Sequence, residues 1–254
     1  MKSSVSKIHE LKKDDETLDT FYHGKILVLQ KKKGYRFSID APLLADFIQT
    51  RKSDELLELG TGSGIISLLL TIKPLKKIIA LEIQESLADL AQRNVILNNL
   101  QKKITILHGD LSSFSLEKRF DVIFSNPPYQ KWGTGNLSPS LEKTVARHEI
   151  KCDINDILTT TARLLKKRGR AYFIYRIMRE EDFKTALDKT ELKIKKIRYV
   201  KPKFNSPANL FLVELDFVSN SSEILPPLII YNEQQKYTEE IQEIFAGRIY
   251  DSTN

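Results

Sequence analysis

The stretch Asn126-Pro127-Pro128-Tyr129 holds the residue types that point most directly to chemistry. Two consecutive prolines fix the backbone and remove two N–H donors directly after an asparagine. The Asn126 side-chain oxygen and the Pro127 carbonyl oxygen can therefore accept hydrogen bonds from one exocyclic NH2 group, while the Tyr129 ring stacks on the planar group that bears it. Two such acceptors aim the lone pair of a poorly nucleophilic nitrogen. The pattern predicts transfer of an electrophilic methyl group to that nitrogen without an obligatory general base.

Gly60, Gly62 and Gly64 form a second candidate site, where a short apolar run gives way to a helical pattern. Their G-x-G-x-G spacing differs from the G-x-G-x-x-G of dinucleotide binders, and the lysine of a phosphate-binding P-loop is missing. A tight turn from strand to helix also needs glycine, so a purely structural role stays open.

Three carboxylates accompany these glycines along the chain. Glu58 directly before them could meet an ammonium group. Glu82, at the end of the next apolar run, could accept both hydroxyls of a ribose, and Asp110 after the third run could face an adenine amine. Single carboxylates at strand ends are common, but together these three outline an adenosine with an amino-acid tail.

About twenty residues rich in Gly, Ser, Asn and Pro (130–149) follow the Asn-Pro-Pro-Tyr stretch, and long loops inside compact domains are often functional. We consider His148 a candidate base or substrate contact, and Lys131, Trp132 and Arg147 candidates for phosphate contact or base stacking. An exposed loop without function is the alternative. The sequence contains no metal-ligand or Ser-His-Asp pattern, so we expect no metal.

From residue 54 onward, short apolar runs alternate with segments of helical periodicity, which is typical of an α/β fold with a parallel sheet covered by helices. The last two strands follow one another without a helix and should be antiparallel. The predicted strands are residues 56–59, 78–82, 104–107, 120–124, 170–175, 193–200 and 210–217, and the predicted helices are residues 65–70, 87–97, 153–167 and 180–189.

Two flanking segments complete the predicted organisation. Residues 1–53 contain a hairpin of residues 25–29 and 35–39 and a helix opened by Asp40 and Pro42, and we treat them as an extension of the domain at residues 54–219. Residues 220–254 form an acidic C-terminal tail with a helix around residues 237–245.

Composition bounds the class of protein. The 254 residues are 41% apolar and 29% charged, which excludes disordered, collagen-like and disulfide-rich classes. Cys152 is the only cysteine, which favours a reducing compartment, so we expect a cytoplasmic protein without a membrane span.

The net charge of +7 is unevenly distributed. Residues 151–210 carry 16 basic and 7 acidic side chains, whereas residues 211–254 carry 2 and 8. Basic clusters at residues 31–33, 166–170 and 193–203 are of the kind that attracts a polyphosphate backbone, although lysine runs are usually solvated surface.

Taken in order, residues 58–64, Glu82, Asp110 and residues 126–129 resemble the motifs of class I S-adenosylmethionine-dependent methyltransferases that modify amino groups. Residues 35–45, 146–149 and 225–231 further resemble the bacterial tRNA1(Val) adenine-N6-methyltransferase family. The resemblance implies a Rossmann-like, seven-stranded, mostly parallel sheet with an antiparallel last strand, and a monomer that methylates the adenosine 3′ of the anticodon. It also assigns residue roles by matching motif: Asn126, Pro127 and Tyr129 hold the target adenine, and Gly60, Gly62, Gly64, Glu82 and Asp110 hold S-adenosylmethionine.

Three alternatives stay open at this point. A methyltransferase for the glutamine amide of release factors resembles the chain at the same Asn-Pro-Pro-Tyr site, but that family carries a helical N-terminal domain. Methylation of another RNA or of DNA is a second alternative. A binding module without catalysis is a third, although it would need neither Asn126 nor the glycines.

Overall fold

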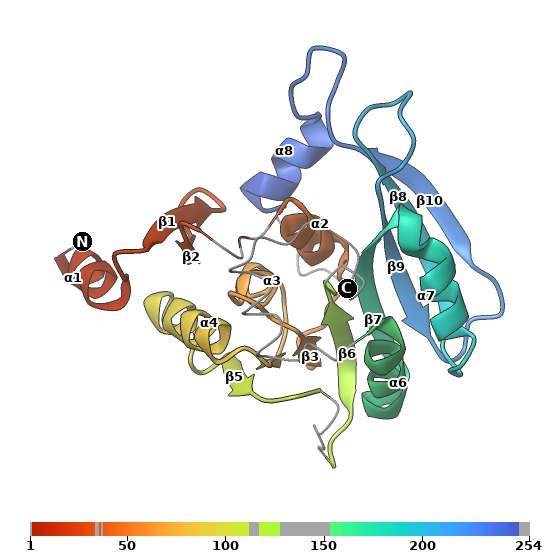
Figure 1. Cartoon of the computed structure of the whole chain (residues 1–254), viewed down its shortest axis with the longest axis horizontal. Helices are drawn as coiled ribbons and strands as arrows, with labels where there is room; N and C mark the ends of the chain where they lie inside the picture. Colours follow the sequence, from red (N-terminus) through yellow and green to blue (C-terminus); the bar gives the residue numbers. More distant parts are fainter. Residues whose placement is uncertain (1, 34–35, 37, 112–116, 128–152, 249–254) are drawn as a thin grey trace, which may run out of the picture.

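The computed structural model describes residues 2–33, 36, 38–111, 117–127 and 153–248, and its centre is an eight-stranded sheet (Figure 1). The sheet strands are β3 (Glu55–Leu59), β4 (Lys77–Glu82), β5 (Ile104–His108), β6 (Phe120–Ser125), β7 (Leu165–Arg176), β8 (Lys193–Lys201), β9 (Leu210–Asp216) and β10 (Glu223–Ile229). The helices are α1 (Lys2–Leu11), α2 (Asp40–Phe47), α3 (Ile65–Leu70), α4 (Glu85–Leu97), α6 (Ile154–Leu164), α7 (Glu180–Leu187), α8 (Glu239–Ala246) and the 3-10 helix η1 (Ile177–Arg179).

The strands follow the order β5-β4-β3-β6-β7-β9-β8-β10, and only β9 runs antiparallel to its neighbours. The predicted α/β fold with a mostly parallel sheet is confirmed, but the sheet has eight strands instead of the seven expected. The extra strand, β10, contains Pro226 and Pro227, which speak against a strand in the sequence. Prolines are tolerated on an edge strand, and the pairing of β10 with β8 shifts register at these residues.

The order of the strands reverses between β3 and β6. From β3 the chain proceeds outward through β4 and β5, and it then returns to β6 on the other side of β3. In open α/β sheets, ligands bind beyond the carboxyl ends of the strands at such a switch point. The topology therefore directs attention to the residues that follow β3 and β6.

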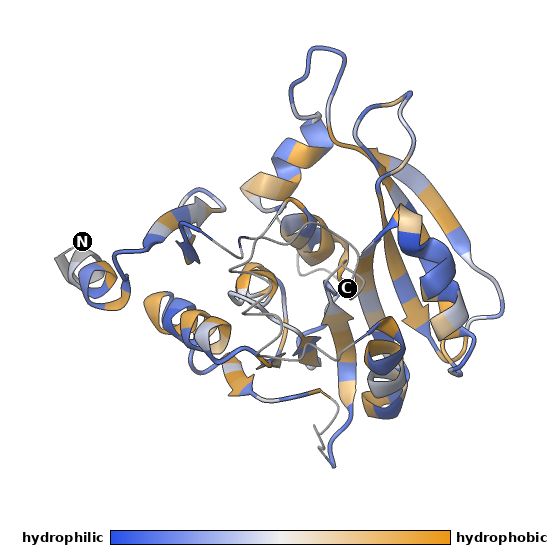
Figure 2. Ribbon diagram, viewed as in Figure 1, coloured by the Kyte–Doolittle hydropathy of each residue, from blue (hydrophilic) through white to orange (hydrophobic). Residues whose placement is uncertain are grey.

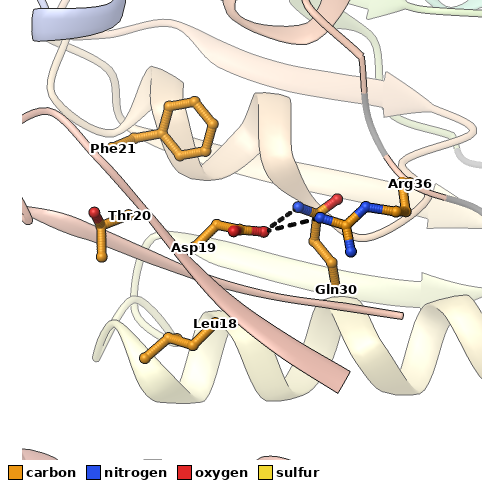
Figure 3. Close-up of a pocket in the computed structure, with 6 residues that line it drawn as sticks. All are labelled: Leu18, Asp19, Thr20, Phe21, Gln30 and Arg36. Atoms are coloured by element: carbon orange, nitrogen blue, oxygen red, sulfur yellow. Dashed lines mark hydrogen bonds and ion pairs between the residues drawn. The ribbon is translucent and has the colours of Figure 1, made fainter. Parts of the chain in front are cut away.

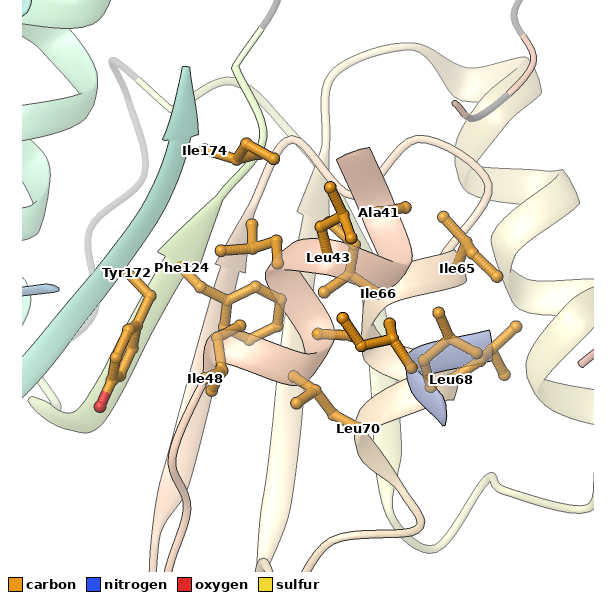
Figure 4. Close-up of a cluster of buried hydrophobic side chains, with 14 of the residues drawn as sticks. Ala41, Leu43, Ile48, Ile65, Ile66, Leu68, Leu70, Phe124, Tyr172 and Ile174 are labelled. Atoms are coloured by element: carbon orange, nitrogen blue, oxygen red, sulfur yellow. The ribbon is translucent and has the colours of Figure 1, made fainter. Parts of the chain in front are cut away.

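Hydrophobic side chains cover both faces of the sheet. Phe124 and Tyr172 pack with α2, α3 and α8 in one layer (Figure 4), and Ile123 and Phe173 pack with α6 and α7 in the other. Successive residues of β6 and β7 alternate between the layers because side chains along a strand point to opposite faces. Figure 2 shows the same arrangement, with hydrophobic residues on the strands and on the helix faces turned toward them. Each such side chain contributes about 2 kcal/mol by leaving water, so the strands form a rigid platform.

A β-hairpin precedes the sheet, as predicted, but it consists of different strands. It pairs β1 (Glu16–Phe21) with β2 (Ile26–Lys31), and its turn places Tyr22, His23 and Gly24 at φ of 53°, 56° and 81°. The predicted pairing of residues 25–29 with residues 35–39 is not found in the described part of the chain: β2 pairs with a strand upstream of it, and Arg36, Ser38 and Ile39 belong to no strand. Tyr35 and Phe37 lie outside the described residues. The helix α1 was not predicted.

Two asparagines of the α4 region occupy the other edge of β2. The Asn94 amide accepts from the Leu29 N–H at 2.7 Å and donates to the Leu29 carbonyl at 3.0 Å. The Asn98 amide accepts from the Leu27 N–H at 2.9 Å and donates to the Leu27 carbonyl at 2.7 Å. These amides therefore satisfy the backbone groups of Leu27 and Leu29 that a further strand would need at this edge of β2.

A buried ion pair fastens the hairpin to α4. The Arg93 guanidinium donates two hydrogen bonds of 2.7 Å to the fully buried Glu16 carboxylate. Burial alone would raise the pKa of Glu16, but the contacts with Arg93 and the Lys13 N–H lower it to about 2. The N-terminal extension is therefore packed on the domain of the central sheet through specific polar contacts.

The acidic C-terminal segment also packs on the sheet. Its helix α8 confirms the predicted acidic helix, and the boundary predicted at residue 219 falls between two strands of one sheet. Two ion pairs join this segment to β8: Glu223 to Lys196 at 3.4 Å and Glu240 to Arg198 at 2.9 Å. Arg248 pairs within the segment, with Glu240 at 3.1 Å and Glu243 at 3.4 Å. Among the described residues, no helix is both long and apolar enough to span a bilayer.

Candidate functional site

The glycine turn and the Asn126 segment meet where β3 and β6 lie side by side. Glu58 pairs in register with Phe124, and the same offset of 66 residues relates Gly60 to Asn126. The hydroxyl of the buried Ser125 donates to the Leu59 carbonyl at 2.6 Å and so ties the two strand ends together. The structure therefore brings two candidate sites that are far apart in sequence to one point of the sheet edge.

The glycine turn has a backbone that side chains would strain. Gly60, Gly62 and Gly64 have φ of 74°, 57° and 82°, the left-handed region that favours glycine. A Cβ on Gly60 would meet no atom of the described residues within 4 Å, so the described structure leaves space beside it, whereas a Cβ on Gly64 would lie 3.3 Å from Cβ of Ala91. Gly64 thus also serves close packing of α3 on α4, while Gly60 borders free space.

Glu82 holds the glycine turn from the neighbouring strand. Its carboxylate accepts the Gly62 N–H at 2.7 Å and the Gln84 N–H at 2.9 Å. Burial raises the pKa of Glu82 despite these hydrogen bonds. Each carboxylate oxygen keeps a further lone pair for a hydroxyl donor. The backbone carbonyl of Glu82 also accepts the Gly109 N–H at 2.9 Å, which brings the half-buried Asp110 to the same edge.

Glu58 lies beneath the glycine turn and is 1% exposed. One of its carboxylate oxygens accepts hydrogen bonds from the Thr61 hydroxyl at 2.6 Å and from the Ser67 hydroxyl. The other oxygen, Oε1, has no hydrogen-bond partner within the described part of the chain. Burial raises the pKa of Glu58 to about 7, although the two hydroxyls oppose that shift. Glu58 therefore braces the turn and offers one buried acceptor to a ligand.

The sequence analysis missed two residues that shape this site, Ser125 and Asn94. Besides its contacts with Leu29, the fully buried Asn94 donates to the Ser63 carbonyl at 2.9 Å and so joins the hairpin to the glycine turn. A polar residue at an apolar position of the helical pattern was the available indication for Asn94. Ser125 offered no indication, because its role depends on the neighbouring strand.

Asn126 is half-buried and Pro127 is buried at the end of β6. These two are the described members of the predicted substrate site. Six residues discussed above lie outside the described residues: Pro128, Tyr129, Lys131, Trp132, Arg147 and His148.

Part of the predicted basic surface lies at the opposite edge of the sheet. The cluster 166–170 forms the amino-terminal part of β7, where Lys166 pairs with Asp121 at 2.8 Å and Arg170 pairs with the buried Asp54. In the cluster 31–33, Lys31 pairs with Asp15 at 2.9 Å. These charges were predicted to attract RNA, but several of them pair with acidic side chains of the same chain, and the pair Arg170–Asp54 is largely buried.

A surface pocket of about 570 Å³ lies on the hairpin (Figure 3). Asp19 projects into it and accepts hydrogen bonds from Gln30 and Arg36, the latter at 3.5 Å. Arg36 also donates to the Lys31 carbonyl at 2.9 Å. These contacts fasten the segment before α2 to the hairpin, and none of the lining residues was predicted to be functional.

The donors and acceptors around the glycine turn fit the ligand that the sequence outlined. Gly60 borders open space, the Oε1 atom of Glu58 is a buried acceptor suited to an ammonium, and Glu82 is a carboxylate suited to a diol. An adenosine with an amino-acid tail presents these complementary groups. The residues present therefore fit S-adenosylmethionine.

Comparisons with known proteins agree with this geometry. The family model of the methyltransferase small domain matches residues 36–199, more than half of the chain. A tRNA1(Val) (adenine(37)-N6)-methyltransferase from Bacteroides thetaiotaomicron is 28% identical over 227 residues, which cover 88% of this chain and 94% of that protein. The protein of the same name from a Flavobacteriaceae bacterium is 29% identical over 151 residues, 59% of this chain and 63% of the relative.

Solved structures show the same fold. A predicted O-methyltransferase from Agrobacterium tumefaciens superimposes with a TM-score of 0.64 at 18% identity, covering 82% of this chain and 96% of that one. A protein from Listeria monocytogenes, described as a class I S-adenosylmethionine-dependent methyltransferase, superimposes with a TM-score of 0.52 at 18% identity. The match covers 84% of this chain and 69% of that one. The family resemblance drawn from the motifs and the cofactor it implies are confirmed. The chain belongs to the methyltransferase small domain family, with the fold of class I S-adenosylmethionine-dependent methyltransferases.

Proposed function

We propose that this protein methylates the N6 amine of adenine 37 in tRNA1(Val). The observation that carries the proposal is the juncture of β3 and β6, where the Ser125–Leu59 hydrogen bond holds Asn126 and Pro127 beside the glycine turn. The proposed substrate is that in the names of the relatives, and the Asn-Pro-Pro-Tyr stretch is the reason to expect that the methyl group goes to an amino group.

S-adenosylmethionine, when bound, supplies an electrophilic methyl group. The residues assigned to hold it are those of the glycine turn and its carboxylates. The backbone of Gly60 and Gly62 would border the ligand, Glu82 would accept from the ribose hydroxyls, Asp110 would accept from the adenine amine, and Oε1 of Glu58 would accept from the ammonium. All of these residues lie at the carboxyl edge of the sheet, at the ends of β3, β4 and β5, and β3 is the neighbour of the strand that leads to Asn126.

Asn126 and Pro127 act on the nitrogen that accepts the methyl group. The side-chain oxygen of Asn126 and the carbonyl oxygen of Pro127 each accept a hydrogen bond from one of the two N–H groups of the adenine amine. This pairing draws the nitrogen lone pair out of conjugation with the ring and orients it. Because Pro127 is buried and follows a strand tied at Ser125, the acceptors are held in place before substrate arrives.

An adenine in a tRNA loop can be unstacked at low cost, which makes it accessible to a site of this kind. We further propose tRNA as the macromolecular partner, a monomeric enzyme and a cytoplasmic location. The roles of Tyr129, Lys131, Trp132, Arg147 and His148 in holding the substrate stay predictions.

The test is transfer of tritiated methyl from S-adenosylmethionine to total tRNA that lacks this modification, followed by digestion to nucleosides and chromatography. Label in N6-methyladenosine from valine tRNA supports the proposal. Label in another nucleoside would support methyl transfer to RNA but show that the target is a different nucleotide. If RNA takes up no label, and a release factor supplied in place of tRNA is labelled on glutamine, the protein-directed alternative is right.

A further inference from the structure

A second surface at the carboxyl edge of the sheet exposes large apolar side chains. Phe204, in the loop between β8 and β9, is 75% exposed, and Met178 in η1, directly after β7, is 79% exposed. The loop projects at the upper right of Figure 1, at the same end of the sheet to which β6 points. β8 runs parallel to β7 and β6, so this loop and the Asn126 segment lie at one edge.

The loop that presents Phe204 is anchored by its backbone. The carbonyl of Pro202 accepts the Tyr231 N–H at 2.9 Å, and the Ser206 N–H donates to the Lys203 carbonyl at 3.0 Å. Asn209 joins the loop to η1, because its carbonyl accepts the Ile177 N–H at 2.9 Å. The aromatic ring is therefore presented by a structured loop, and the end of that loop contacts the η1 helix that contains Met178.

The charge of this loop differs from that of the strand that leads into it. The cations in the middle of β8 have acidic partners: Lys195 with Glu214, Lys196 with Glu223 and Arg198 with Glu240. Lys201 and Lys203 are the only charged residues of the segment 201–209, and no salt bridge between described residues involves either of them. Positive charge thus stays uncompensated next to Phe204.

The separation suits a nucleic acid strand. β8 and β6 are separated by β9 and β7, so three strand spacings of about 4.8 Å put their ends about 15 Å apart. At about 3.4 Å per stacked nucleotide, this distance corresponds to about four nucleotides. An exposed aromatic ring flanked by lysines is the arrangement that stacks on an unpaired base while cations hold the phosphates.

We propose that Phe204, Lys201 and Lys203 form a second contact surface for the RNA strand that contains the target adenine. Phe204 stacks on an unpaired base a few nucleotides from the target, Met178 extends the apolar surface, and the two lysines bind the backbone. This inference rests on the proposed tRNA substrate.

The experiment measures binding of the full-length chain to fluorescein-labelled, unmodified tRNA1(Val) transcript by anisotropy, together with KM and kcat for methyl transfer. Phe204→Ala should weaken binding and raise KM about tenfold, within the range expected for one lost base stack, with kcat unchanged. Phe204→Trp should bind like the unaltered protein. Val218→Ala, which removes a side chain that is 63% exposed beyond β9 at the opposite edge, is the matched control and should change nothing.

The lysines are tested by the salt dependence of binding. Lys201→Gln with Lys203→Gln should reduce the slope of log affinity against log salt by about 1.4, the value for two phosphate contacts on a single strand. The exposed pair Lys167→Gln with Arg168→Gln, at the opposite edge, should leave the slope unchanged.

The outcomes separate this surface from the proposed function. If the unaltered protein methylates tRNA and Phe204→Ala binds it equally well, the surface is disproved and the function stands. Equal weakening by Val218→Ala would also disprove it. If the unaltered protein neither binds nor methylates tRNA, both proposals fail.

Discussion

The two edges of the central sheet use their charged residues in opposite ways. At the amino edge, acidic and basic side chains pair with one another: Asp54 with Arg170, Asp121 with Lys166, and Glu55 with Lys76 and Lys118. At the carboxyl edge, Glu58 and Glu82 bind hydroxyls and backbone N–H groups instead of cations.

The pKa shifts follow this difference. The hydrogen bond with Lys118 lowers the pKa of Glu55, whereas burial raises the pKa of both Glu58 and Glu82. Paired charges stabilise the fold and leave little for a ligand, while a buried acceptor without a cation is open to an external donor. Stability should therefore depend on the amino edge, and catalysis and binding on the carboxyl edge.

The largest expected effect is on stability at the amino edge. Asp54→Ala leaves the guanidinium of Arg170 without its buried partner and should lower the free energy of unfolding by about 3–5 kcal/mol. Urea denaturation measures the loss. In protein that remains folded, kcat should match that of the unaltered enzyme, and a fall in kcat at full folding would contradict the division between the edges.

Asn126→Ala is the corresponding test at the carboxyl edge. It removes an acceptor aimed at the reacting nitrogen and should lower kcat about 100-fold or more, as for loss of one group that stabilises a transition state. Cofactor affinity, measured by calorimetry, and the free energy of unfolding should change little. An unchanged kcat would disprove the role assigned to Asn126.

The buried Glu58 predicts a dependence of stability on pH. Its pKa is about 7 in the folded protein and 4.5 in its ordinary state, so the folded state takes up the proton at the higher pH. The free energy of unfolding should therefore rise as pH falls through about 7, by up to about 3 kcal/mol in total near pH 4.5.

The isosteric variant Glu58→Gln isolates this contribution from those of other groups. The difference in the free energy of unfolding between the unaltered protein and the variant should depend on pH between 8 and 5. A constant difference would show that Glu58 titrates normally.

The smallest expected effect is that of Ser125→Ala. Loss of the hydrogen bond to the Leu59 carbonyl should cost about 1 kcal/mol of stability. Because the bond ties Asn126 to the glycine turn, kcat should fall about fivefold while KM for tRNA stays constant. A loss of stability with no change in kcat would show that the link is structural alone.

Much of the fold was predictable from local pattern. The strand at residues 120–124 is found, and the helix predicted at residues 153–167 begins after Asp153 with a capping box between Asp153 and Asp156. It ends at Leu164, earlier than predicted, because residues 165–167 already belong to β7. Apolar periodicity and capping residues act within a few positions, so they can be read from the chain. The hairpin partner of β2 and the edge strand β10 could not be read in this way, since both depend on which edges are free after folding.

The sequence by itself determined the order of the motifs and the residue types that define an amino-directed methyltransferase, because glycine conformations and the Asn-Pro-Pro geometry are local properties. Only the tertiary structure decided which charges are paired and which residues meet at the site. Arg170 finds Asp54 across 116 residues, and Ser125 finds Leu59 across 66. Such contacts form only when the strands are placed side by side, because hydrogen bonds and ion pairs act over a few ångströms in space and not along the chain.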